Sequence, residues 1–301
     1  MPADIPFVRD IEFEYGKADQ VSPLIRRVVA NNPGGFTYKG TGTYIVGQDE
    51  VAVIDPGPLD EAHIDALLGA IKGETVSHIL ITHTHMDHSP AAKPLKAHTG
   101  APTYGFGPHG GAARNSDGPK LEEGADFDFV PDVVVGDGTV IDGKGWTIEC
   151  VHTPGHTSNH ICFGLREEKA LFTGDHVMGW STSIVSPPDG NMQAYMASLT
   201  KLLARSDEIY WPTHGPAITD PKPFVEAYLA HRRDREDQIL AQIAKGRTRI
   251  KDMVPEMYAN VDARLHPAAA RSVLAHMELL AATGRIKCEG PPSLSSDYLP
   301  A

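Results

Sequence analysis

The chain is poor in cysteine, with only Cys150, Cys162 and Cys288 in 301 residues. The three lie far apart and form no CxxC pair, so their spacing supports neither a disulfide framework nor a cysteine-bound zinc site. Cys150 and Cys162 fall in strand-like apolar runs and are expected to pack in the core. Because so little cysteine suits a reducing compartment, we expect a cytoplasmic protein.

Long hydrophobic runs are also missing. Hydrophobic residues make up 41% of the chain, but no run approaches the roughly 18 apolar residues that a membrane span needs. The first residues include Asp4, Arg9, Asp10 and Glu12 and contain no apolar segment of the kind found in signal peptides. The sequence therefore predicts no membrane partner.

Positive charge is scarce over most of the chain, whose formal net charge is −12. Residues 222–301 hold 12 of the 27 basic and 10 of the 39 acidic residues, which leaves 15 basic and 29 acidic residues for the rest. An acidic main body disfavours general binding to nucleic acid. The glycines between 105 and 111 are followed by no GK[ST] and open no GxGxxG helix, so no nucleotide-binding loop is predicted.

What the chain does have is the segment 82–88, Thr-His-Thr-His-Met-Asp-His, directly after a strand-like apolar run. Side chains two apart on an extended segment share a face, so His83 and His85 can point at one ion. Asp87 and His88 follow as the chain turns and can face a second ion. Imidazole and carboxylate together suit zinc, and also iron or manganese. A histidine-rich surface loop is the alternative, but HxHxDH after a buried strand does not favour it.

Three further candidate ligands follow expected strands, each beside a glycine or proline that allows a sharp turn. Loops at strand ends, held by a rigid sheet, are where sites accumulate, so we expect these side chains to join the segment 82–88. His160 could reach the substrate or a supporting carboxylate, and we predict it to be catalytic together with Asp87. The three ligands are His156, Asp175 and His214, after expected strands at 147–151, 169–172 and 208–211.

Strand and helix patterns alternate over the first 220 residues, which predicts an α/β fold. Asp60 is a plausible N-cap for the first helix, and the loop 105–126 is expected near the active face. His109 in that loop, His176, Trp180 and Tyr195 are further candidates for the pocket wall or for packing. Other strands are expected at 42–47, 51–55, 76–81 and 161–163, and helices at 60–69, 91–98 and 192–203.

The pattern changes after His214. Helices are expected at 222–244, 251–258 and 267–282, and Gly284-Arg-Ile-Lys287 reads as a turn into a β-ribbon, an order that resembles a winged helix. We therefore predict two domains, 1–220 and 221–301. The second is expected to cover one flank of the pocket or to make a homodimer contact. The Pro- and Ser-rich end, 291–301, is expected to fray.

The order HxHxDH, then His, Asp and His, resembles the metallo-β-lactamase superfamily over roughly residues 20–220. The resemblance implies a four-layer αββα sandwich with two metal ions between the loops at one edge. It implies that His83, His85 and His156 hold the first ion, that Asp87, His88 and His214 hold the second, and that Asp175 bridges the two. Zn²⁺ is the ion expected first, with Fe or Mn as alternatives.

A closer resemblance covers nearly the whole chain. The segment 153–160 (TPGHTSNH), the GDxxxG stretch at 174–179, the segment 181–185 and the helix around 228–233 are similar to the β-lactamase-like protein two group. The eukaryotic member of that group is a mitochondrial endoribonuclease that acts on single-stranded RNA. Bacterial relatives are hydrolases often described as resembling glyoxalase II.

Two neighbouring divalent ions lower the pKa of a shared water towards about 7, so hydrolysis is the expected chemistry. The acidic body favours a small substrate, namely an ester, thioester, lactone or lactam. The alternative is a metal-dependent endoribonuclease specific for single-stranded RNA. The closer resemblance supports it, and the basic cluster Lys245, Arg247, Arg249 and Lys251 could touch phosphates.

Four other classes are less favoured. A DNA-binding regulator needs a basic recognition helix, but the expected helix 267–282 holds only Arg271. Oxygen-reducing flavoproteins of the superfamily typically have Glu where this chain has His85, and they carry a flavin domain that this sequence does not show. Mononuclear persulfide dioxygenases stay open, because ligand type does not fix the metal. Nucleases with a large insert are set aside, since only 38 residues separate Asp175 from His214.

Overall fold

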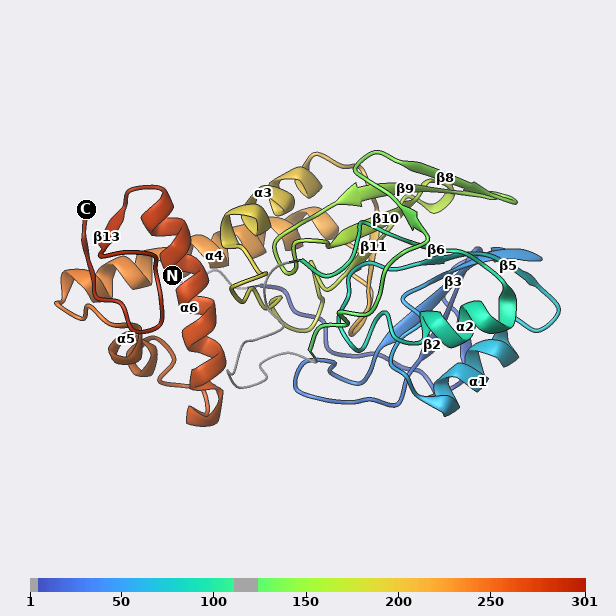
Figure 1. Cartoon of the computed structure of the whole chain (residues 1–301), viewed down its shortest axis with the longest axis horizontal. Helices are drawn as coiled ribbons and strands as arrows, with labels where there is room; N and C mark the ends of the chain where they lie inside the picture. Colours follow the sequence, from blue (N-terminus) through green and yellow to red (C-terminus); the bar gives the residue numbers. More distant parts are fainter. Residues whose placement is uncertain (1–4, 111–123) are drawn as a thin grey trace.

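Two mixed β-sheets face each other in the computed structural model, which describes residues 5–110 and 124–301. Figure 1 shows the sheets in one unit, with the helices of the C-terminal region gathered beside it. Among the described residues, no helix is long and apolar enough to cross a membrane.

The first sheet has seven strands in sequence order. Neighbouring strands are antiparallel from β1 to β4 and parallel from β4 to β7. The strands are β1 (Ala18–Gln20), β2 (Ile25–Val29), β3 (Gly42–Gln48), β4 (Glu50–Ile54), β5 (Thr75–Leu80), β6 (Thr103–Gly105) and β7 (Val133–Val134).

The second sheet has five strands in the order β12-β11-β10-β9-β8. β11 and β12 are parallel and the other pairs are antiparallel, so β9, β11 and β12 all run in one direction. The strands are β8 (Val140–Gly143), β9 (Trp146–His152), β10 (Ile161–Leu165), β11 (Ala170–Gly174) and β12 (Ile209–Pro212), with a 3-10 turn at Arg166–Glu168.

Helices cover both outer faces of the sheet pair. α1 (Glu61–Ala70) and α2 (Ala92–Thr99) pack on the first sheet, while α3 (Met192–Leu203) and the start of α4 (Pro221–Ala244) pack on the second. A third apolar cluster, which includes Tyr44, Trp146 and Phe163, fills the space between the sheets. This arrangement confirms the predicted αββα sandwich.

Local capping explains where two of these helices begin. The Asp60 carboxylate accepts a hydrogen bond from His63 N (2.8 Å), as its predicted role as N-cap requires. The Asn191 side chain accepts one from Ala194 N (2.8 Å) at the start of α3. Each cap satisfies a backbone donor that the first helical turn leaves unpaired.

The C-terminal unit contains α5 (Ile250–Met257), a 3-10 turn (Ala263–Leu265), α6 (His266–Ala282), and the paired strands β13 (Ile286–Cys288) and β14 (Tyr298–Pro300). The prediction that 291–301 frays is wrong. Tyr298 is fully buried in the apolar cluster of this unit, and its N–H donates to Thr248 O. Tyr298 thus holds the end of the chain against the helices.

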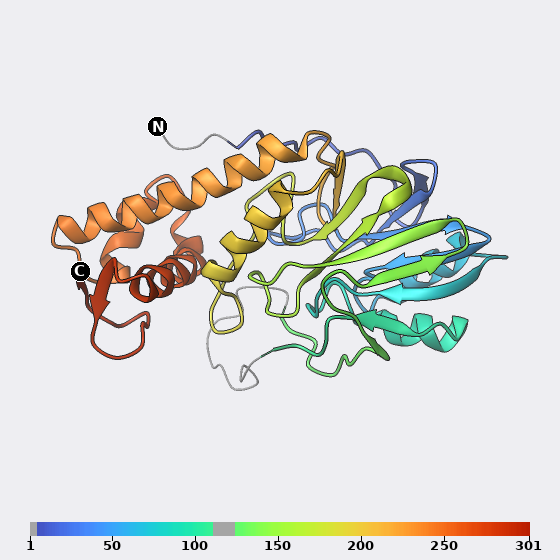
Figure 2. The same ribbon diagram turned by 90° about the horizontal axis from the view of Figure 1, so that it is seen from above.

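The long helix α4 belongs to both units. Its first half contributes Phe224 and Tyr228 to the core beside α3, and its second half contributes Ile239 and Ile243 to the core of the C-terminal unit. Figure 2 shows this orange helix running from the sandwich into that unit. The boundary predicted at 220/221 coincides with the start of α4 and stays a prediction.

Candidate metal centre

The site is built at one edge of the sandwich, where the carboxyl ends of β4, β5, β9, β11 and β12 meet. Two hydrogen bonds join the sheets there: Ile161 N donates to Thr82 O and Gly42 N donates to Thr213 O, both at 2.8 Å. The loops after these strands are therefore fixed on rigid supports, as sites made of several loops require.

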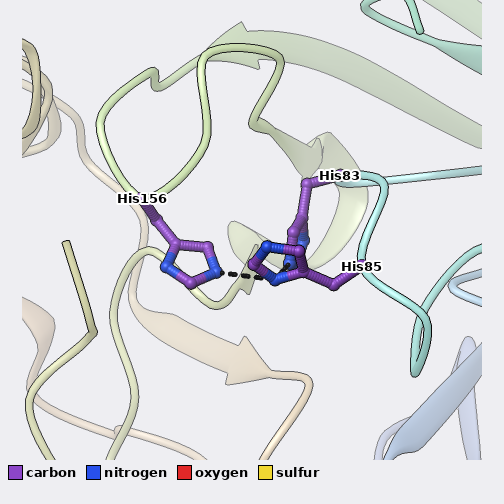
Figure 3. A group of neighbouring side chains, drawn as sticks. All are labelled: His83, His85 and His156. Carbon is purple, nitrogen blue, oxygen red and sulfur yellow. Dashed lines mark hydrogen bonds between the residues drawn. The ribbon is translucent and has the colours of Figure 1, made fainter. Parts of the chain in front are cut away.

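Three histidines converge on one point. His85 Nδ1 lies 3.0 Å from His83 Nε2 and 3.2 Å from His156 Nε2. Figure 3 shows the rings of His83 and His85, from the loop after β5, turned towards His156, from the loop after β9. All three are buried. We call them the three-histidine cluster.

A second group, the Asp87 cluster, consists of Asp87, His88 and His214. Asp87 Oδ2 lies 3.0 Å from His214 Nε2 and 3.4 Å from His88 Nε2. Among the described residues, neither of these nitrogens has a partner in hydrogen-bond geometry, although both are buried. The two ring nitrogens and the carboxylate oxygen thus face a common centre.

Asp175 stands between the two clusters. Its Oδ1 lies 3.4 Å from His214 Nε2 and 3.6 Å from His88 Nε2, whereas its Oδ2 lies 3.8 Å from His156 Nε2. Gly174 allows this placement, because its φ of +51° is left-handed and a Cβ there would lie 2.6 Å from His160 Nε2. A carboxylate with one oxygen towards each cluster occupies the position that a bridging ligand needs.

The donor set fits divalent metal ions. The candidate ligand atoms fall into groups of three, each within 4.8 Å, formed by His83–His85–His156, His83–His88–Asp175 and Asp87–His88–His214. Buried polar atoms are normally paired, yet Nε2 of His88 and of His214 and Oδ1 of Asp175 have no hydrogen-bond partner among the described residues. Imidazole nitrogens and carboxylate oxygens are the donors that zinc, iron and manganese accept.

The two clusters differ in electrostatics. Burial and the neighbouring histidines hold the pKa of His83 well below its usual value. Burial alone would lower the pKa of His88, but the carboxylates of Asp87, Asp175 and Asp55 hold it well above that value. Burial opposes ionisation of Asp87, but His88 and His214 outweigh it and hold the Asp87 pKa well below its usual range.

Asp55 is the residue that sequence reasoning missed. It is fully buried at the end of β4, has a left-handed backbone (φ 48°), and accepts hydrogen bonds from Thr82 N (2.8 Å) and Thr82 Oγ1 (2.7 Å). Its Oδ2 also accepts from Thr213 Oγ1 (3.0 Å) and from His88 Nδ1 (2.9 Å). The available signal was an aspartate directly after an apolar strand and before Pro56.

Hydrogen bonds to the opposite ring nitrogens orient the ligands. Because the Thr82 hydroxyl donates to Asp55, it accepts from His83 Nδ1 (3.1 Å). His156 Nδ1 donates to Ile184 O (2.6 Å) and His214 Nδ1 donates to Gly40 O (3.1 Å). Each contact places the proton on Nδ1 and leaves the Nε2 lone pair for a metal.

His160 lies beneath the ligands and is fully buried. Its Nδ1 contacts Thr153 Oγ1 (2.9 Å), and its Nε2 accepts from Asp175 N (3.3 Å). His160 is therefore placed to position Asp175, and it is not among the described residues that line the hollow over the ligands. Its predicted catalytic role stays a prediction. His176, also fully buried, packs on Tyr195 at 4.7 Å between ring centroids.

A small hollow opens over the two clusters. His85, Asp87, His156 and Asp175 form its floor, and Phe36, Met178 and Ile184 form its wall. Tyr195, a candidate for this wall, is instead fully buried in the core.

Trp180 stacks on Tyr38, with 4.8 Å between ring centroids, and so ties the segment that carries Met178 to the loop that carries Phe36. His109 contacts Thr84 Oγ1 through Nδ1 (2.9 Å), close to His85. Part of the loop predicted at 105–126 lies outside the described residues, because 111–123 are not among them.

Comparison with known proteins agrees with this geometry. The model of the metallo-β-lactamase superfamily matches residues 38–214. The chain belongs to the metallo-β-lactamase superfamily. It is an enzyme of this fold, a hydrolase, and the model of the β-lactamase-associated winged helix domain matches residues 250–291. This second match confirms the predicted winged helix.

Similar proteins span nearly the same length. A lactamase-like protein, adaB, from Aspergillus niger is 29% identical over 96% of this chain and 93% of its own. An atrochrysone carboxyl ACP thioesterase from Claviceps purpurea is 32% identical over 81% of this chain and 75% of its own. A β-lactamase domain protein from Burkholderia ambifaria, known from its crystal structure, is 20% identical in sequence. The comparison covers 99% of this chain and 97% of that one with a TM-score of 0.78, so the two share a fold.

Proposed function

We propose that the protein hydrolyses small acyl thioesters and related esters with two divalent ions, Zn²⁺ in the first instance. The observation that carries this proposal is the hollow, in which three apolar side chains stand over a floor of four candidate ligands. No lysine or arginine is among its described lining residues. Such a wall suits an uncharged acyl chain, whereas a phosphate backbone is normally met by positive side chains.

Divalent ions bound here would supply a water of lowered pKa and a positive charge for the oxygen of the acyl carbonyl. The three-histidine cluster would hold one ion and the Asp87 cluster the other, with Asp175 shared between them. Asp55 keeps His88 oriented, and Ile184 O keeps His156 oriented. Phe36, Met178 and Ile184 keep the acyl chain beside the ligands and away from bulk water.

The relatives support the same chemistry. The Claviceps purpurea protein is named as a thioesterase, and at 32% identity it aligns with four fifths of this chain. Thioester cleavage needs an activated water and a polarised carbonyl, which the proposed metal centre provides.

Endoribonuclease activity is less well supported. Within the basic cluster proposed to touch phosphates, Arg247 pairs with Glu256 (3.1 Å) and Arg249 pairs with Asp297 (2.8 Å). Helix α6, which corresponds to the recognition helix of a winged-helix protein, buries Ala269, Val273 and Ala275. The ion pairs occupy two of the arginines that RNA binding would use, and the buried residues of α6 belong to apolar cores.

The test is to measure metal content and, in parallel, turnover of S-acyl thioesters of increasing chain length, a lactone, a chromogenic β-lactam and a short single-stranded RNA. We expect two metal ions per chain and thioester cleavage that rises by up to about fourfold for each methylene buried against the wall. Asp87→Ala serves as the blank. If the wild-type chain cleaves RNA but no thioester, and Asp87→Ala does not cleave RNA, the ribonuclease alternative would replace the proposal.

A further inference from the structure

One segment, residues 176–188, touches both the metal centre and the C-terminal unit. It follows Asp175 and runs past the hollow before α3 begins. Its conformation therefore bears on the ligands on one side and on α4 and α6 on the other.

On the side of the metal centre, this segment supplies one hydrogen-bond acceptor and two wall residues. Ile184 O accepts from His156 Nδ1 at 2.6 Å, so the position of this carbonyl fixes the ring of a ligand. Met178 and Ile184 also line the hollow. A shift of this backbone would change the metal ligand and the substrate wall together.

On the other side, α4 holds the segment through two buried residues one helical turn apart. The Tyr228 hydroxyl accepts from Met178 N (3.2 Å) and faces the carbonyls of Met178 (2.6 Å) and Ser181 (2.5 Å). The Arg232 guanidinium donates to Ser183 O, directly before Ile184. Tyr228 is fully buried and Arg232 is 3% exposed, so both contacts are shielded from water.

Helix α6 adds a third contact. Arg271 donates to Pro187 O at 3.1 Å. Arg271 is the only Lys or Arg within α6, and its contact is with the segment 176–188. Polar side chains of α4 and α6 therefore bind backbone on both sides of Ile184.

We infer that the first half of α4, together with Arg271 of α6, is a built-in support of the metal centre. Tyr228, Arg232 and Arg271 are positioning residues: through the segment 176–188 they set the orientation of His156 and the place of the apolar wall. The inference rests on metal binding as proposed above, but not on the thioester substrate. Through Arg271, which α6 supplies, the winged helix would share in this support, and this role needs no nucleic acid.

The test uses the full chain and Co²⁺, whose visible absorption reports histidine coordination. The metal-free protein is titrated with Co²⁺ in the wild type, Tyr228→Phe, Arg232→Met and Arg232→Lys. Arg233→Met serves as a matched control, because Arg233 is the exposed neighbour on the same helix. Thermal melting checks that each variant is folded.

We expect Tyr228→Phe and Arg232→Met to weaken binding at the three-histidine cluster by about tenfold, the lower end for groups that orient a ligand. The absorption band should shift, and KM for thioesters should rise. Arg232→Lys should recover part of the loss, and Arg233→Met should match the wild type. If Arg232→Met does not fold, the result for Tyr228→Phe decides whether the inference holds, because that substitution removes only one oxygen atom.

Wild-type Co²⁺ affinity and spectrum in folded Tyr228→Phe and Arg232→Met would overturn the inference. A wild-type chain that binds no Co²⁺ would overturn both this inference and the proposed function. A wild-type chain that binds Co²⁺ but leaves thioesters intact would overturn the proposed substrate alone, and the positioning role would still be decided by the Co²⁺ spectra.

Discussion

The three-histidine cluster and the Asp87 cluster lie side by side but are supported by different groups. His83 and His156 are oriented by a neutral hydroxyl and a backbone carbonyl. In the Asp87 cluster, His214 is likewise oriented by a backbone carbonyl, Gly40 O, but His88 is oriented by the Asp55 carboxylate. Both histidines of this cluster also face carboxylate oxygens of Asp87 and Asp175.

This difference has a chemical consequence. The pKa of His83 is lowered mainly by burial, while the pKa values of His88 and His214 are raised because the carboxylates outweigh burial. In the three-histidine cluster, His83 is therefore held towards its neutral form, whereas the Asp87 cluster contributes a carboxylate. Two ions bound here would experience unequal fields, although each cluster takes two of its three residues from the same segment, 82–88.

Asp87→Ala should have the largest effect on the difference between the two clusters. Loss of the carboxylate should empty the Asp87 cluster and leave one metal ion at the three-histidine cluster. Thioester kcat/KM should fall by more than about a hundredfold, because removing a metal ligand should cost more than removing a group that only orients a ligand. Metal analysis and steady-state kinetics measure both effects. The control is Asp142→Ala at an exposed position of β8. Full turnover in Asp87→Ala with metal restored would contradict the assignment.

Asp55→Asn should have the next largest effect. It keeps the shape of the side chain but removes the charge that orients His88 and accepts from Thr82 and Thr213. We expect metal affinity of the Asp87 cluster to fall by about 10- to 100-fold, with the three-histidine cluster less affected. Competition with a chelator measures each affinity. Asp132→Asn, which alters a carboxylate bound to Thr103 away from the site, is the matched control, and equal losses in both variants would argue against the role of Asp55.

The candidate ligands could be proposed from sequence because each is a distinctive residue type that follows a strand. The spacing of His83, His85, Asp87 and His88 is local, so it can be recognised without knowledge of the fold. Asp55 also follows a strand directly, but its role could not be predicted, since its partners Thr82, His88 and Thr213 lie 27, 33 and 158 residues away. Only the folded sheets bring them together.

The C-terminal unit shows the same limit. Its helices were predicted from their residue pattern, and the predicted bounds fall close to the observed ones. The composition of 291–301 suggested fraying, but tertiary packing of Tyr298 overrode it. The contacts of Tyr228, Arg232 and Arg271 with backbone carbonyls carry no sequence signature, because any residue supplies a carbonyl.

Proton release should sharpen the contrast between the clusters. In metal-free protein, the neighbouring carboxylates raise the pKa values of His88 and His214, so a metal ion binding at the Asp87 cluster must compete with protons on these rings. The metal affinity of this cluster should therefore fall by about tenfold for each proton displaced as pH drops by one unit. The affinity of the three-histidine cluster should depend less on pH, because burial and the neighbouring histidines hold the pKa of His83 well below its usual value. Calorimetry between about pH 6 and 8 in buffers of different ionisation enthalpy measures this, and equal proton release at both steps would refute it.

Phe36→Ser should produce the smallest effect and leave both clusters intact. Phe36 is half-buried in the wall of the hollow and is not a candidate ligand. Losing its apolar surface should raise KM for longer acyl thioesters by about five- to thirtyfold, equivalent to about 1–2 kcal/mol of burial, while kcat and both metal affinities stay unchanged. Leu59→Ser, at a position 70% exposed, is the control. A matching rise in KM for the shortest thioester would show that Phe36 acts on the metal centre and not on the acyl chain, and the wall would then have to be assigned to Met178 and Ile184 alone.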